Sequence, residues 1–202
     1  MIKRCDWVKE GIHQNYHDIE WGVPLHNDQK LFELLLLGGA QAGLSWMTIL
    51  KRREGYRNVF DGFDPEKIGC YKKTDINRIL KDVRIIRNRK KVEAFVNNAK
   101  CFLKVREKFE TFDSYLWRFV DFKTIVNYHK TWHDIPSTSD ESSEMSACLK
   151  KDGFTFVGPT ICYAFMQSVG MVNDHIISCF RHKDVSKEHV SNLRNMSKTE
   201  KN

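Results

Sequence analysis

The sequence lacks any long hydrophobic run. Hydrophobic residues make up 41% of the 202 positions, but no stretch approaches the roughly 20 consecutive apolar residues that a transmembrane helix needs. The N-terminal residues MIKRCDWVKEG also lack the apolar segment of a secretory signal peptide. We therefore expect a cytoplasmic protein without a membrane partner, associated with the nucleoid if its source is bacterial.

Strand-like alternation, internal repeats and composition breaks that would mark a linker are missing as well. Apolar residues instead recur at spacings of three and four, which is typical of helices. We predict an all-α fold, with one domain over residues 1–185 and a sizeable core. Residues 186–202 have no apolar face and are predicted to form a disordered polar tail. We expect the protein to be a monomer.

Capping residues and breakers locate the individual helices. The polar pair Asn27-Asp28 precedes the apolar run KLFELLLL, and Pro159 suits the first turn of the helix TICYAFMQSV. The predicted helices begin, in order, after Asn27, at Ser45 (to about Phe60), at Thr74, before Val92, at Thr111 (to Phe119), after the polar loop 136–146, at Pro159 (to Gly170) and at Met171 (to Phe180).

Positive charge is concentrated in one segment. The whole chain carries a net charge of +7, whereas residues 78–108 hold eleven Lys or Arg against three acidic residues, a net of +8. A solvated helix face would explain a lone charge run. Here the band coincides with a helix-turn-helix pattern at about residues 74–103, in which Ile76, Ile79, Leu80 and Val83 form the first apolar stripe. The combination favours a polyanionic partner such as DNA.

The turn of this pattern lies within DVRIIRNRKK. A short turn between helices can present backbone N–H groups and a helix N-terminus to a phosphate group. An ordinary helical hairpin on the surface is the alternative. The basic side chains expected to add charge at the turn are Arg84, Arg87, Arg89, Lys90 and Lys91.

Four side chains at the two ends of the chain form a candidate metal site. His175 and Cys179 are four residues apart on a predicted helix, so both would face the same way. Cys5 and His17 offer a complementary pair, and a Cys2His2 set suits tetrahedral zinc. A core cysteine beside a surface histidine is the simpler explanation of the spacing alone. The six cysteines are expected to be buried thiols or metal ligands rather than disulfides.

Aromatic residues gather in the N-terminal quarter, at Trp7, Tyr16, Trp21 and Trp46. Some of them must belong to the core. Packed around the glycine-rich backbone of LLLLGGAQAGLSW, residues 34–46, they could also form a slot for a flat ligand such as a base flipped out of a duplex.

Several motifs together resemble the DNA-3-methyladenine glycosylase I family, within the helix-hairpin-helix glycosylases. The resemblance covers roughly residues 1–180, in order and at similar spacing. The matching blocks are C-x-W at Cys5–Trp7, YHDIEWGVP at Tyr16–Pro24, KLFELL at Lys30–Leu35, QAGLSW at Gln41–Trp46, FDP at Phe63–Pro65, IIR at Ile85–Arg87, LKKDGFTFVGPTICYAFMQSVG at Leu149–Gly170 and VNDH at Val172–His175.

The resemblance implies a helix-hairpin-helix fold, a structural zinc site and the removal of 3-methyladenine from alkylated double-stranded DNA by hydrolysis of the N-glycosidic bond. It maps base stacking onto Tyr16 and Trp46, and it maps the segment that fills the gap left by the flipped nucleotide onto Gly43 and Leu44. The zinc ligands that it implies are Cys5, His17, His175 and Cys179.

The chain departs from the family pattern at four positions. The family has a pocket glutamate where Gly38 stands, often a tyrosine at His13 and a serine at Ala164, and usually a glycine at Arg84. The catalytic group is therefore unassigned. The expected substrate-binding positions are His13, Tyr16, Gly38, Trp46 and Ala164. We do not expect Glu20, Glu33 or Asp174 to replace the missing carboxylate.

Three functions remain to be weighed. The leading one is a glycosylase of base excision repair that acts on alkylated bases, chiefly 3-methyladenine. The alternative is a damaged-DNA-binding module with weak, altered or no activity, because Gly38 replaces the carboxylate. A zinc-stabilised protein-interaction domain is the third, and the basic segment argues against it.

Overall fold

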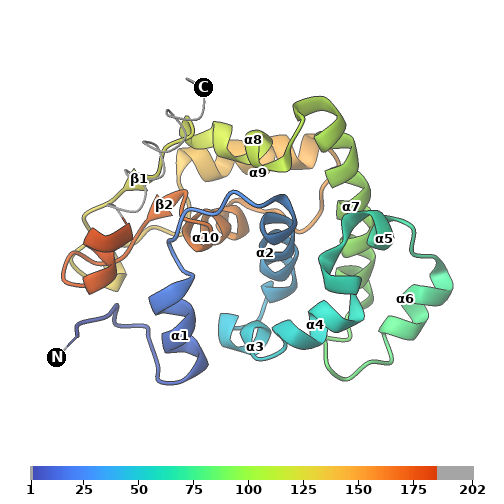
Figure 1. Cartoon of the computed structure of the whole chain (residues 1–202), viewed down its shortest axis with the longest axis horizontal. Coiled ribbons are helices and arrows are strands. Elements are labelled where there is room, and N and C mark those ends of the chain that lie inside the picture. The colour runs from blue at the N-terminus through green and yellow to red at the C-terminus, as the bar shows by residue number, and fades with distance from the viewer. Residues whose placement is uncertain (1, 186–202) are drawn as a thin grey trace, which may run out of the picture.

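The computed structural model describes residues 2–185 and is predominantly helical (Figure 1). The predicted all-α fold class is confirmed, and the predicted tail lies outside the described residues. The helices are α1 Ile12–Ile19, α2 Asp28–Gln41, α3 Trp46–Leu50, α4 Arg53–Val59, α5 Pro65–Gly69, α6 Lys73–Ile79, α7 Arg89–Phe109, α8 Phe112–Trp117, α9 Asp140–Lys151 and α10 Pro159–Ser168. None of the helices in this part of the chain is both long and apolar enough to cross a membrane.

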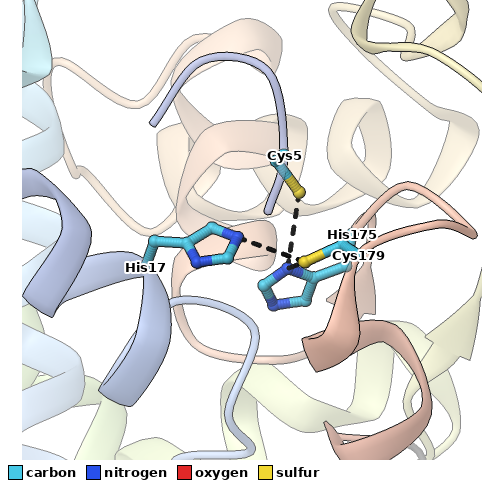
Figure 2. Close-up of side chains that lie close together, drawn as sticks. All are labelled: Cys5, His17, His175 and Cys179. Carbon is cyan, nitrogen blue, oxygen red and sulfur yellow. Dashed lines mark hydrogen bonds between the residues drawn. The ribbon is translucent and has the colours of Figure 1, made fainter. Parts of the chain in front are cut away.

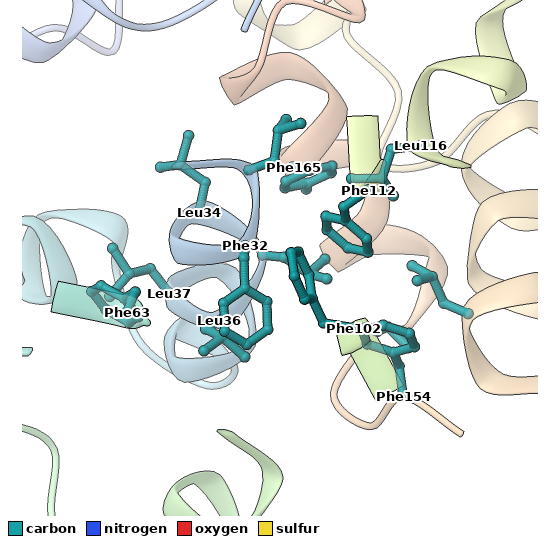
Figure 3. Close-up of a cluster of buried hydrophobic side chains, with 14 of the residues drawn as sticks. Phe32, Leu34, Leu36, Leu37, Phe63, Phe102, Phe112, Leu116, Phe154 and Phe165 are labelled. Carbon is teal, nitrogen blue, oxygen red and sulfur yellow. The ribbon is translucent and has the colours of Figure 1, made fainter. Parts of the chain in front are cut away.

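Helix α2 lies in the middle of the molecule, between α10 and α7 (Figure 1). It is apolar on nearly all sides, and Phe32, Leu36 and Leu37 are fully buried (Figure 3). Burying each such side chain contributes roughly 1.5–3 kcal/mol. Because α2 packs against several other helices, the side chains on its C-terminal half have fixed positions.

The predicted helix starts are largely confirmed. Asn27, Ser45 and Thr111 each accept a hydrogen bond from a backbone N–H in the first turn that follows them, as N-caps do. Pro159 opens α10 as predicted. The helix predicted from Ser45 to about Phe60 is instead two helices, α3 and α4, because Arg52 adopts non-helical backbone angles between them.

The helical hairpin consists of α6, a turn over residues 80–88 and α7. The first apolar stripe ends earlier than predicted, since α6 stops at Ile79 and Val83 is 73% exposed. The Asp82 carboxylate accepts the backbone N–H of Arg84 at 2.9 Å, which favours a turn over a continued helix. Asn88 caps α7, whose apolar face is buried as predicted.

The predicted last helix, Met171–Phe180, is wrong. Residues Val172–Asn173 form a two-residue strand, β2, that pairs in parallel with β1, Ile125–Val126. The Asn173 side chain then accepts the backbone N–H of His175 at 3.2 Å. The pairing with the distant strand β1 and this local hydrogen bond both compete with helix formation, and the next helical residues in the described chain are 180–185.

Candidate functional site

Two cysteines and two histidines from opposite ends of the chain converge (Figure 2). Cys179 Sγ lies 3.5 Å from His17 Nε2 and 3.6 Å from His175 Nδ1. Cys5 Sγ lies 3.6 Å from the same nitrogen of His175. All four residues are buried, and their ligand atoms lie within 4.8 Å of one another.

This cluster of Cys5, His17, His175 and Cys179, the metal-ligand cluster, has dimensions that suit one metal ion. Bonds of about 2.0–2.3 Å in a tetrahedron place neighbouring ligand atoms roughly 3.3–3.8 Å apart. The distances found between sulfur and nitrogen fall in that range. His175 and Cys179 reach the cluster from the loop after β2 and not from one helix, so the predicted route is wrong although the residues do come together.

Hydrogen bonds behind the cluster orient both imidazoles. His17 Nδ1 lies 2.7 Å from an oxygen of Asp18, and the Arg4 guanidinium donates to both oxygens of that carboxylate. His175 Nε2 lies 3.1 Å from the carbonyl oxygen of Trp21. Such contacts set the tautomer and leave His17 Nε2 and His175 Nδ1 free for a metal ion.

Two of the four ligands, Cys179 and His175, are held in the form that binds a metal ion, whereas Cys5 must lose a proton on binding. A hydrogen bond from Cys5 is the main reason why the pKa of Cys179 is lowered, to about 2, whereas the same contact raises the pKa of Cys5. Burial lowers the pKa of His175, which keeps the ring neutral. Thiolate and neutral imidazole are the forms that bind zinc.

A cavity of about 530 Å³ lies beside the metal-ligand cluster. We call it the aromatic pocket. Segments from α1, α2, α3 and α10 meet there, and all five expected substrate-binding residues contribute to its wall. The lining residues are Trp7, Lys9, His13, Tyr16, Trp21, Leu34, Gly38, Gln41, Ser45, Trp46, Met47, Trp132, Ala164, Phe165, Gln167 and Ser168.

Tyr16 and Trp46 touch each other at the wall of this pocket. Their ring centroids are 5.4 Å apart and their planes are inclined by 49°. A base held between two parallel rings needs about 7 Å, twice the contact distance between carbon atoms. A bound base would therefore lie against the pocket side of these rings. Burial raises the pKa of Tyr16, so its hydroxyl stays protonated and cannot act as a base at neutral pH.

His13 is neutral at physiological pH. Burial, followed by the positive charge of Lys9, lowers its pKa below the usual 6.5. Its ring packs against Trp7, with centroids 4.8 Å apart. A neutral imidazole can line the pocket without repelling a cationic ligand.

No Asp or Glu is among the residues that line the aromatic pocket in the described chain. Glu33 is held by Arg53 and Arg57, and Glu20 is held by Arg53. Asp174 accepts hydrogen bonds from Asn127, Tyr163 and Gln167. None of these three acids lines the aromatic pocket. That they do not replace a carboxylate at Gly38 stays a prediction.

Trp132 is a pocket residue that was not predicted from the sequence. Trp132 lies in a short 3-10 turn, Trp132–Asp134, between β1 and α9. It is 38% exposed and contacts Trp7 with ring centroids 5.9 Å apart. No local signal marks it, because it meets the pocket through residues more than 100 positions away.

The residues expected to contact DNA lie on two exposed segments. Gly43, with a φ of 75°, and Leu44, 39% exposed, form the tip of the loop 42–45, which we call the wedge loop. In the turn of the hairpin, Arg84 is tied to Asp82 and Arg89 to Asn77, while Arg87 and Lys90 are also exposed. Arg84 has ordinary backbone angles, so no glycine is required there.

Lys91 does not belong to the exposed basic surface, contrary to the prediction. It is 8% exposed, and its ammonium group donates hydrogen bonds to the carbonyl oxygens of Ala40 at 2.8 Å and Ala42 at 2.7 Å. The sequence pattern could not distinguish it from Lys90, because both follow Asn88 in the same turn of α7.

The family model for methyladenine glycosylases matches residues 7–182 of this chain. The chain belongs to this family. It is 45% identical over 179 residues to DNA-3-methyladenine glycosylase 1 of Escherichia coli K12, covering 88% of this chain and 96% of that protein. It is 47% identical over 180 residues to DNA-3-methyladenine glycosylase of Haemophilus influenzae, covering 89% and 97%. A crystal structure of 3-methyladenine DNA glycosylase I superposes with a TM-score of 0.86 at 45% identity, over 88% of this chain and 98% of that one. The methyladenine glycosylase fold thus extends over nearly the whole described chain.

Proposed function

We propose that this protein is a 3-methyladenine DNA glycosylase that acts in base excision repair of alkylated DNA. The observation that carries the proposal is the aromatic pocket, which lies in a methyladenine glycosylase fold and has Tyr16 and Trp46 in its wall. The substrate is double-stranded DNA with an alkylated base turned into this pocket, and the protein acts as a monomer.

The chemistry places modest demands on the pocket. Alkylation at N3 gives the adenine ring a positive charge, so the base is already a good leaving group. Water forms a bond to C1′, the bond from C1′ to the base nitrogen breaks, its electron pair neutralises the base, and the water loses a proton to solvent. An aromatic face beside the cationic base contributes roughly 0.5–2 kcal/mol. Neutral His13 and the aromatic walls of the pocket are compatible with such a ligand.

DNA is held by the wedge loop and the hairpin. Gly43 and Leu44 would fill the gap that the flipped nucleotide leaves. Arg84, Arg87, Arg89 and Lys90 would contact phosphate groups. We expect binding to weaken steeply as the salt concentration rises, because phosphate contacts release counterions.

The metal is zinc, one ion per chain, in a structural role. Four protein ligands from two thiols and two imidazoles form a closed tetrahedral set, which leaves no position for a substrate or a reactive water. When bound, the ion holds the N-terminal segment to the loop after β2. No step of base excision passes through it.

A base-release assay tests the proposed function. The protein is incubated with dimethyl-sulfate-treated DNA, and free bases in the supernatant are separated and identified. We expect 3-methyladenine above the level of a sample without protein. If no base of any kind is released by folded, metal-loaded protein, the proposed activity is wrong.

The alternative is a damaged-DNA-binding module that does not break the glycosidic bond. The pocket lining, which has no carboxylate, favours this alternative. It predicts salt-dependent binding that is tighter to alkylated than to unmodified duplex, without release of base. Binding and release measured on the same labelled duplex distinguish the two functions.

A further inference from the structure

A buried lysine links the start of α7 to the end of α2. Lys91 is the third residue of α7, and its backbone N–H is capped by the Asn88 side chain at 3.2 Å. Its side chain reaches the carbonyl oxygens of Ala40 and Ala42, 51 and 49 positions earlier in the chain. Ala42 is the C-cap of α2 and the first residue of the wedge loop.

The position of this ammonium group is unfavourable for its own helix. A positive charge in the first turn of α7 opposes the helix dipole, and a lysine is rarely buried without partners. At the C-terminus of α2 the same charge is favourable, because the last carbonyl groups of a helix have no partners within it. The contacts with α2 therefore account for the burial of Lys91.

The wedge loop has few other restraints. Leu44 N–H donates to the Gln41 carbonyl at 2.7 Å, and Ala42 N–H donates to the Gly39 carbonyl at 3.3 Å. Gly43 has open space around its Cα atom, and Leu44 is partly exposed. Ser45 holds the far end of the loop, since its side chain accepts the backbone N–H of Thr48 at 3.2 Å and caps α3. Lys91 holds the near end, where the chain leaves α2.

We propose that Lys91 is a positioning residue for base excision: it holds the wedge loop in register with the basic turn of the hairpin. This inference rests on the proposed function for its effect on catalysis. Phosphates bound by the turn at residues 84–90 would fix the duplex relative to α7. Because Lys91 also fixes the wedge loop relative to α7, Gly43 and Leu44 would lie opposite the gap that the flipped nucleotide leaves in the duplex.

The first test needs no DNA. Amide hydrogen exchange is compared between the wild type, Lys91→Met and Lys91→Gln, with Lys90→Met as the matched control for loss of a neighbouring exposed charge. We expect exchange of the hydrogen-bonded amides of Ala42 and Leu44 to be at least tenfold faster in Lys91→Met and less affected in Lys91→Gln, which retains a donor. Lys90→Met should match the wild type. Unchanged exchange in folded Lys91→Met and Lys91→Gln would overturn the proposal.

The second test measures the effect on DNA. A duplex with an abasic analogue opposite 2-aminopurine reports insertion of the loop by its fluorescence. We expect Lys91→Met to reduce the fluorescence change and the single-turnover rate of base release at least tenfold, with zinc content and binding of free 3-methyladenine unchanged. Lys108→Met, which removes an exposed charge near the other end of α7, is the control and should leave the fluorescence change and the single-turnover rate unchanged. A wild-type rate and fluorescence change in Lys91→Met would refute the role in excision.

The two tests keep the inference separate from the proposed function. If the wild type releases no base but Lys91→Met still loosens the wedge loop and abolishes the fluorescence change, the glycosylase assignment fails and the positioning role stands. Should Lys91→Met unfold, Lys91→Ala, which also lacks a donor, carries both measurements, and equal exchange and fluorescence in that variant and the wild type would contradict the role.

Discussion

Gly38 lies in the last turn of α2, on the face that lines the aromatic pocket. A Cβ atom there would meet only Ile161 Cγ2, at 3.6 Å, which is an ordinary contact. Its backbone angles are helical, so neither φ nor packing requires glycine at this position. The fold would therefore accept a side chain at this position, and that side chain would extend into the aromatic pocket.

We predict that Gly38→Glu increases excision of 3-methyladenine. A charged hydrogen-bond partner contributes about 1.5–3 kcal/mol, which corresponds to roughly ten- to hundredfold in kcat/KM. Gly38→Gln has the same size without the charge and should gain less, and Gly38→Ala controls for the removal of glycine from a helix. The measurement is single-turnover release of base. An unchanged or lower rate in correctly folded Gly38→Glu would show that a missing carboxylate does not limit this pocket.

His13 should set the acidic limit of activity. Its pKa is lowered, so the ring is neutral above pH 6.5 and becomes positive only as the pH falls below that value. A positive ring, added to the charge of Lys9, would repel a cationic base. We predict that the rate of base release in the wild type falls only once the pH is below 6.5, the usual pKa of histidine. In His13→Phe, which keeps a flat ring without titrating, that fall should disappear. The same fall in both proteins would assign the titration to another group.

At the scale of elements, the hairpin is held against α4 at a single glycine. A Cβ atom on Gly55 would lie 2.7 Å from both the Cβ atom and the carbonyl oxygen of Arg84, too close for either to remain in place. The Tyr56 hydroxyl accepts the backbone N–H of Ile86 at 3.2 Å. Helix α4 therefore sets the position of the turn that is proposed to face DNA.

We predict that Gly55→Ala displaces this turn. Overpacking typically lowers the free energy of unfolding by about 1–3 kcal/mol. Replacing a helical glycine by alanine raises it by about 0.5–1 kcal/mol. Urea unfolding should show a free energy of unfolding about 1 kcal/mol below that of the wild type, and the variant should bind duplex DNA more weakly. Gly69→Ala in α5 is the control, because its added Cβ atom would meet Leu103 Cδ1 at an ordinary 3.5 Å. If Gly55→Ala is as stable as Gly69→Ala and binds DNA normally, the close approach does not constrain the turn.

At the scale of the whole molecule, the metal-ligand cluster joins the two ends of the described chain. Beyond the four ligands, the backbone N–H of Phe180 donates to the carbonyl of Lys3 at 3.0 Å. Trp7 and Trp21 lie between the cluster and the aromatic pocket, contacting His17 and His175 as well as each other. Loss of the metal ion should therefore disturb the pocket wall.

We predict one zinc ion per chain and a marked loss of stability when it is removed. Chelation should lower the Tm by roughly 10 °C, since each kcal/mol is worth about 2–4 °C in a chain of this size. It should also make Cys5 and Cys179 reactive towards thiol reagents in the folded protein. Cys179→Ser should reproduce the loss, whereas Cys70→Ser, at an exposed thiol, should not. A metal-free protein with wild-type Tm and two reactive cluster thiols would refute a structural zinc site.

Local patterns in the sequence determined much of this protein. The spacing of apolar residues and the caps at Asn27, Ser45 and Thr111 specify helices, because these signals act within one or two turns. The identity of the four cluster ligands follows from their chemistry and the family resemblance. Other predictions failed. A distant strand pairs with β2, which replaced the last helix. A local hydrogen bond to Asp82 closed the turn after α6 and left Val83 exposed.

Only the tertiary structure decided how the site is assembled. Trp132 joins the pocket, Lys91 turns from the basic surface to the end of α2, and the nearby acids are neutralised by Arg53 and Arg57. None of these facts is encoded within a few residues of the positions concerned. They arise because packing of the central helix α2 brings together side chains that are tens to more than a hundred positions apart.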